Sequence, residues 1–211
     1  MIPQDLWRLI TRHVFAYPSS ATLFNPYAAC HAGADRADAC AIRRKNLRGY
    51  LSSFPEPPGI LLVGEASGPW GCRFSGVPFT SERQLCSGEL PFAGRQSSTH
   101  DEPHHERTAG IFWDVMARHH PRCFIWNAVP LHPHPAGEPF SLRRPSRSDV
   151  KAFAELLNGL VERLAPAQII AVGRIAQRAV QDVGQTPVYV RHPSHGGMRE
   201  FRTGIDRILC T

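Results

Sequence analysis

The chain has 211 residues, of which 42% are hydrophobic and 20% are charged, and its formal net charge is +6 at pH 7. This length favours a single domain over residues 1–211, large enough to bury a core. No apolar run approaches the ~20 residues of a membrane span, and charges interrupt the apolar pattern at the N-terminus, which argues against a signal peptide. The positive charge favours an anionic partner, nucleic acid first, although many other enzymes are equally basic.

The cysteines and histidines show no pattern that predicts a disulfide or a metal site. None of the six cysteines belongs to a CxxC motif, so we expect reduced thiols in a cytoplasmic protein; they are Cys30, Cys40, Cys72, Cys86, Cys123 and Cys210. Neither HExxH nor a convincing helical H-x3-H occurs among the eleven histidines. We therefore expect no bound metal.

In chain order, a helical N-terminal segment over residues 1–58 comes first. Four short apolar runs rich in β-branched residues follow later, at residues 59–64, 123–129, 168–173 and 187–192. These runs lack the polar alternation of a half-exposed strand, so they indicate strands that are covered on both faces.

Helical patterns lie between these runs, at residues 108–120, 146–166 and 173–184, the second with Ser146 or Ser148 as its N-cap. The alternation predicts an α/β fold: a three-layer α/β/α sandwich around a central, mostly parallel four-stranded sheet. Residues 80–107 fit no element. A loop of that length is usually functional or disordered.

The ends of the strands carry the polar residues of interest. Ligands of an open parallel sheet bind outside the carboxyl ends of its strands. Here those ends hold a glycine-rich turn from Gly64 to Gly68, the amide of Asn127, and His192 close to Ser194. An amide can pair with both a carbonyl and an N–H, as the edge of a nucleobase presents them, and Phe79 offers a flat face for stacking. The residues predict a pocket for a planar heterocycle.

Five motifs occur in order between Gly59 and Ser194: "VGEASG", "GVPF", "WNAVP", "AVGRIAQRAV" and "RHPS". Together they resemble the uracil-DNA glycosylase superfamily, most closely its "GEAPG" branch. The resemblance implies a monofunctional DNA repair enzyme that flips uracil out of single- or double-stranded DNA and hydrolyses its N-glycosidic bond, leaving an abasic site. We also expect a monomer that binds no membrane and, because of the departures described below, needs no cofactor.

The resemblance assigns roles position by position. Phe79 would stack on the flipped uracil, Asn127 would read its O4 and N3, and His192 would stabilise the anion at O2. Glu65 would be a secondary catalytic residue that orients water, since Ala66 stands where several relatives have an aspartate. The remaining contacts would come from Gly64 and Ala66 to the base and from Ser67, Gly68 and Ser194 to the DNA. Independently of the resemblance, Arg95 in the segment of residues 80–107 could contact a DNA phosphate.

The chain departs from this branch in two respects. Many members bind a [4Fe–4S] cluster through four cysteines, whereas Cys30 and Cys40 are far apart in sequence and Leu131 stands at the third ligand position. We therefore expect no cluster. The best-known relatives exclude thymine with a tyrosine at the position of Gly68. Trp70, Arg73 or Phe74 could replace it, and we expect a preference for uracil over thymine.

Each residue also has a structural interpretation. Glu65 could be a carboxylate at a helix N-terminus, Asn127 a partner of buried backbone, His192 a loop residue and Phe79 part of the core. Two other functions stay open: a non-catalytic nucleic-acid-binding protein, and a nucleotide-handling α/β enzyme. The latter should show a P-loop lysine or an aspartate cluster for Mg²⁺, and neither is visible.

Overall fold

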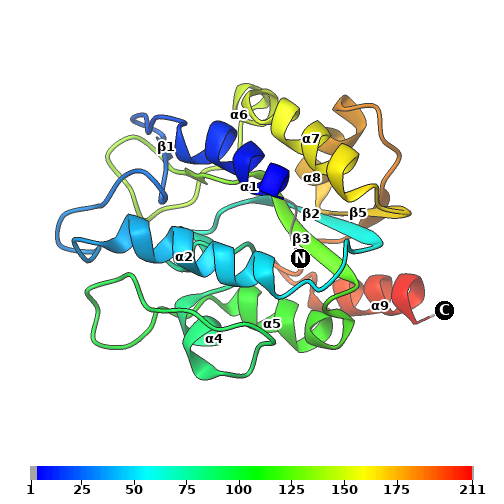
Figure 1. The fold of residues 1–211 in the computed structure, drawn as a ribbon, viewed down its shortest axis with the longest axis horizontal. Helices are drawn as coiled ribbons and strands as arrows, with labels where there is room; N and C mark the ends of the chain where they lie inside the picture. The colour runs from blue at the N-terminus through cyan, green and yellow to red at the C-terminus, as the bar shows by residue number, and fades with distance from the viewer. Residues whose placement is uncertain (1–3, 211) are drawn as a thin grey trace.

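The computed structural model describes residues 4–210, and its centre is a parallel sheet (Figure 1). The strand order is β3-β2-β5-β6, and every neighbouring pair is parallel. The strands are β2 (Ile60–Ala66), β3 (Cys123–Val129), β5 (Gln168–Val172) and β6 (Val188–Val190). The predicted four-stranded sheet and three-layer α/β fold are confirmed.

Helices cover both sides of the sheet (Figure 1). One layer contains α1 (Gln4–Ile10), α6 (Arg147–Ala152), α7 (Ala154–Leu164) and α8 (Arg174–Asp182). The other contains α4 (Glu82–Ser87), α5 (Arg107–Met116) and α9 (Met198–Leu209), and α2 (Ala39–Ser52) runs beside the edge strand β3. Between residues 4 and 210, no helix has the length and apolar character that a bilayer crossing requires.

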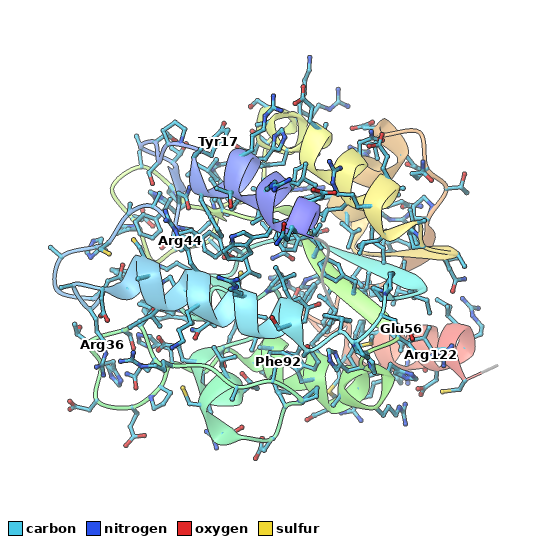
Figure 2. The ribbon with its side chains drawn as sticks, in the orientation of Figure 1. Tyr17, Arg36, Arg44, Glu56, Phe92 and Arg122 are labelled. Carbon is cyan, nitrogen blue, oxygen red and sulfur yellow. The ribbon has the colours of Figure 1, made fainter. Side chains whose placement is uncertain are left out.

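Residues 4–58 pack onto this core, and residues 1–3 of the segment predicted to be helical lie outside the described residues. After α1, the chain continues through a π-helical turn (Thr11–Phe15) to β1 (Leu23–Phe24), which pairs with β4 (His132–Pro133). Arg44 of α2 points toward the α1 side, with its guanidinium carbon 4.9 Å from the centroid of the Phe15 ring (Figure 2). This contact joins α2 to the N-terminal turn.

A buried ion network fixes the N-terminal segment to the turn after β2. Asp35 is fully enclosed, and its carboxylate accepts hydrogen bonds from Arg43 of α2 and Arg73 of α3 (Cys72–Ser75). The Arg73 Nη1 to Asp35 Oδ1 distance is 2.8 Å. The two guanidinium groups hold the pKa of Asp35 below its usual value, although burial alone would raise it.

Two expectations need correction. The helical pattern over residues 146–166 forms two helices, α6 and α7, because the backbone leaves the helical region at Phe153, whose side chain is buried. The N-cap is Ser146, within a capping box. Residues 80–107 are an ordered segment that begins with α4. Its later part is held by the buried Glu82 carboxylate, which accepts from the backbone N–H groups of Ser97 and Ser98.

Candidate active site

Phe79 lies directly against the end of β2. Its backbone has a φ of +53°, and its ring is so close to Gly64 that an added Cβ would lie 2.2 Å from Cε2. Only glycine leaves room for the ring at this point. The ring stacks on Phe112 of α5, with centroids 4.2 Å apart and planes 13° apart. Phe79 remains half-buried, so part of the ring is open to a ligand.

Asn127 of β3 lies on the same side of the sheet. It pairs with Gly64 in the ladder, and a Cβ at Gly64 would lie 2.7 Å from Asn127 Oδ1. The side chain is 2% exposed, and Oδ1 has no hydrogen-bond partner among the described residues. An unpartnered buried acceptor costs about 1–3 kcal/mol. A ligand N–H would remove this penalty.

His192 follows β6 and completes the group, with its ring centroid 5.8 Å from that of Phe79. The backbone N–H of Ser194 donates to His192 Nδ1 at 3.2 Å. A neutral ring that accepts at Nδ1 carries its proton on Nε2. Burial, followed by the charges of Arg191 and His195, lowers the pKa of His192 to about 4. The imidazole is therefore neutral at pH 7 and offers one N–H.

Glu65 lies on the opposite face of β2, because successive side chains of a strand alternate. Its Oε1 accepts the backbone N–H of Ile175 at 3.1 Å, in the first turn of α8. The helix dipole favours a carboxylate there. This contact matches the structural interpretation of Glu65, while Ala66 keeps the Gly64 side of the strand. The catalytic role of Glu65 stays a prediction.

The four residues predicted to contact DNA lie in different surroundings. Ser67 is fully buried, so a phosphate cannot reach its hydroxyl in this structure. Ser194 Oγ is 2.8 Å from His192 Nδ1, so Ser194 belongs to the same group of residues as Phe79, Asn127 and His192. Arg95 is exposed, but its backbone is held against α2 by Asn46. Gly68 is covered by a side chain from elsewhere.

That side chain is Glu106, which the sequence analysis missed. A Cβ at Gly68 would lie 2.3 Å from Glu106 Oε2. Burial raises the pKa of Glu106 to about 7, even though the N–H groups of Gly71 and Trp70 lower it. Of the residues considered for thymine exclusion, Arg73 and Phe74 are buried and only Trp70 is well exposed.

His132 is a second residue whose role was missed. Its Nδ1 is 2.9 Å from the carbonyl oxygen of Ser67. Burial lowers its pKa to about 4, so the ring is neutral and Nδ1–H donates to that carbonyl. This bond fixes the turn that follows β2.

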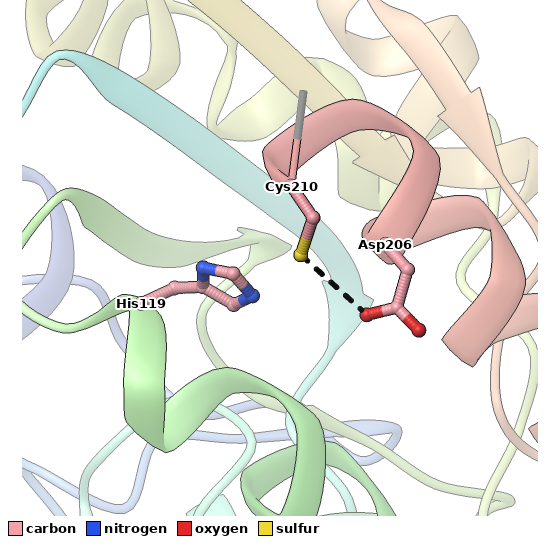
Figure 3. A group of neighbouring side chains, drawn as sticks. All are labelled: His119, Asp206 and Cys210. Carbon is pink, nitrogen blue, oxygen red and sulfur yellow. Dashed lines mark hydrogen bonds between the residues drawn. The ribbon is translucent and has the colours of Figure 1, made fainter.

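One group of metal-ligating side chains occurs in the described part of the chain: His119, Asp206 and Cys210 (Figure 3). The Arg118 guanidinium already binds two of these three side chains. It pairs with Asp206 at 2.5 Å and donates to His119 Nε2 at 3.3 Å. A cation would have to displace this guanidinium. The group is therefore better described as an ion-pair network.

The positions of Cys30, Cys40 and Leu131 bear on the iron–sulfur cluster that many members of the branch bind, and its absence stays a prediction. Cys30 and Cys40 are free, and their sulfur atoms lie 3.2 Å apart, a proximity that their spacing did not indicate. No further cysteine joins them in a ligating group between residues 4 and 210, and Leu131 is buried in the core.

A cavity of about 780 Å³ lies on the Glu65 side of the sheet, between α6, α7 and α8. Its floor is apolar and includes Ala128 and Phe153. Its rim carries the basic side chains of Arg144, Arg147, Lys151 and Arg178. The site around Phe79 is therefore on the other side of the sheet from this cavity.

Comparison with known proteins identifies the family of the chain. Residues 51–204 match the family model described as the uracil DNA glycosylase superfamily. No match occurs among the curated proteins. Among solved structures, the chain is similar to wild-type SMUG2 of Pedobacter heparinus, with a TM-score of 0.61 and 14% identity over 97% of this chain and 95% of that one. The family match covers most of the chain and supports a DNA glycosylase. The chain belongs to the uracil-DNA glycosylase superfamily.

Proposed function

We propose that the protein excises uracil from DNA by hydrolysis of the N-glycosidic bond. One observation carries this proposal: Phe79 and the unpartnered Oδ1 of Asn127 both lie against the bare Cα of Gly64. A flat ring beside an amide suits a planar base that presents a carbonyl and an N–H on one edge. Because such a base is paired inside duplex DNA, the enzyme must extrude it first.

Each residue then has a distinct role. Uracil would stack on the open face of Phe79, with N3–H donating to Asn127 Oδ1 and O4 accepting from its Nδ2. Breakage of the N1–C1′ bond leaves the electron pair on uracil, and the charge spreads to O2. His192 Nε2–H would donate to O2, and water would add to C1′. A neutral donor that is already oriented stabilises this charge without reorganisation.

Glu65 remains the secondary catalytic residue in this proposal. Its carboxylate is bound by the first turn of α8, so leaving-group stabilisation by His192 and Asn127 is the larger contribution. We also infer preference for uracil over thymine, and a monomer in the cytoplasm. The free cysteines fit a reducing compartment.

The test uses a labelled oligonucleotide with one uracil, incubated with the protein and then heated in alkali. Scission only at uracil supports the proposal. Retardation without scission would instead indicate a non-catalytic DNA-binding protein, and comparable scission at a G:T mismatch would contradict the preference for uracil. The absence of both retardation and scission would contradict the proposal and leave a nucleotide-handling enzyme as the open alternative.

Variants assign the roles. His192→Ala and Asn127→Ala should each slow single-turnover excision by about 10²–10³. Asn158→Ala is the matched control, because that amide pairs with Glu162 on the outer surface of α7. Glu65→Gln should retain most activity. Loss of cleavage in Glu65→Gln alone, with activity kept in His192→Ala, would show that water activation dominates.

A further inference from the structure

Glu106 is a half-buried residue that the proposed mechanism does not use, and its carboxylate oxygen Oε2 is buried. It directly precedes α5, and its carboxylate covers the turn of residues 68–71. A Cβ would lie 2.3 Å from Oε2 at Gly68 and 2.6 Å from it at Gly71. Neither distance is possible for real atoms. The carboxylate therefore fills the space that side chains at these two positions would occupy.

The surroundings of Glu106 favour its protonated form. Gly71 and Trp70 direct their N–H groups toward the carboxylate, but burial has the larger effect and raises its pKa to about 7. Oε2 has no hydrogen-bond partner among the described residues. Burial of an unpaired charge is costly. The loss of the proton therefore places an uncompensated charge against the turn.

Glu106 also connects the two elements that hold Phe79. The turn that it contacts continues from β2, whose Gly64 lies against the edge of the Phe79 ring. The helix that it precedes carries Phe112, on which the face of Phe79 stacks. Displacement of the turn relative to α5 would change both contacts of Phe79.

We propose that Glu106 is a positioning residue of the base site, whose carboxyl group sets the distance between the start of α5 and the turn 68–71. This inference rests on the proposed function. Glu106 acts through the turn and α5, because its carboxyl group is enclosed by them. The neutral carboxyl is the form that fits this space. A neutral side chain of the same shape should therefore position the turn equally well.

The experiment compares the pH dependence of uracil excision in the wild type, Glu106→Gln, Glu106→Ala and Glu102→Gln. Glu102 is an exposed carboxylate close by in the chain and is the matched control. We expect the wild-type kcat/KM to fall about tenfold per pH unit above pH 7, as the protonated fraction does. Glu106→Gln should have the kcat/KM of the wild type at pH 7 and should keep this value above pH 7. Glu106→Ala should raise KM more than it lowers kcat, because the turn loses its support.

Three results would overturn the inference. If Glu106→Gln and the wild type have the same pH profile, the positioning role is wrong while uracil excision stands. If wild-type activity rises through pH 7 and Glu106→Gln is inactive, Glu106 accepts a proton from the reactants. If the wild type releases no uracil at any pH, the proposed function fails and the inference fails with it. Circular dichroism of each variant separates these outcomes from unfolding.

Discussion

The buried carboxyl of Glu106 should make the stability of the protein depend on pH, independently of any activity. Its pKa is raised from 4.5 to about 7 in the folded protein. Between these values the folded protein keeps a proton that the unfolded chain has lost. The stability from the protonated carboxyl is thus complete below pH 4.5 and is lost as the pH rises to 7.

The magnitude follows from the two pKa values. The difference between about 7 and 4.5, at about 1.36 kcal/mol per pKa unit, corresponds to about 3 kcal/mol. The carboxyl is buried, so solvent screening reduces this value little. Glu106→Gln cannot ionise and should not lose this stability. His132 and His192 also titrate, with pKa values lowered to about 4, but their contribution is the same in both proteins.

The assay is urea denaturation of the wild type and Glu106→Gln at pH 5 and pH 8. The free energy of unfolding of the wild type, relative to the variant, should fall by about 2–3 kcal/mol between these pH values. Glu102→Gln keeps Glu106 and should lose stability between pH 5 and pH 8 as the wild type does, because the carboxylate that it removes is exposed. If the free energy of unfolding of the wild type, relative to Glu106→Gln, changes by less than about 1 kcal/mol between pH 5 and pH 8, the argument that this carboxyl is held protonated is refuted.

Two further predictions concern close packing around the site. Gly64→Ala should displace the Phe79 ring and slow uracil excision about 10²-fold. Gly59→Ala is the control and should leave the rate unchanged, because a Cβ there meets no atom within 4 Å. Equal rates for the two variants would show that the position of the Phe79 ring is unimportant. Glu82→Ala removes the acceptor for several buried donors and should lower the free energy of unfolding by about 3 kcal/mol or more, unlike the exposed Glu89→Ala. Equal chemical denaturation midpoints for these two variants would contradict that role.

The sequence predicts the sheet and the central group of the site well, because parallel topology places the carboxyl ends of all strands at one edge. Asn127 and His192 end separate strands, and Phe79 is joined to Gly64 through a turn. Their proximity follows from strand order alone. The fold match over nearly the whole chain agrees with the predicted sheet.

The side of the sheet is harder to predict than its edge. Gly64 and Glu65 are adjacent in a glycine-rich turn motif, but they lie in β2, where neighbouring side chains point to opposite faces. Because the sequence analysis treated Gly64 to Gly68 as a turn, it did not predict that the side chains of this segment alternate between the two faces of the sheet. Glu106 could not be found from sequence at all, since its contact with Gly68 depends on how residues 80–107 fold back onto the turn.

The ion network around Asp35 shows that the segment matched to the family is not a self-sufficient module. The match begins at residue 51, yet Arg73 within it is neutralised by a carboxylate that lies before it. A fragment of residues 51–204 would retain a buried guanidinium without its counter-ion, which costs several kcal/mol. The segment that matches the family is therefore shorter than the segment that folds cooperatively. A graft of the site onto another scaffold would have to include Asp35 together with Arg73.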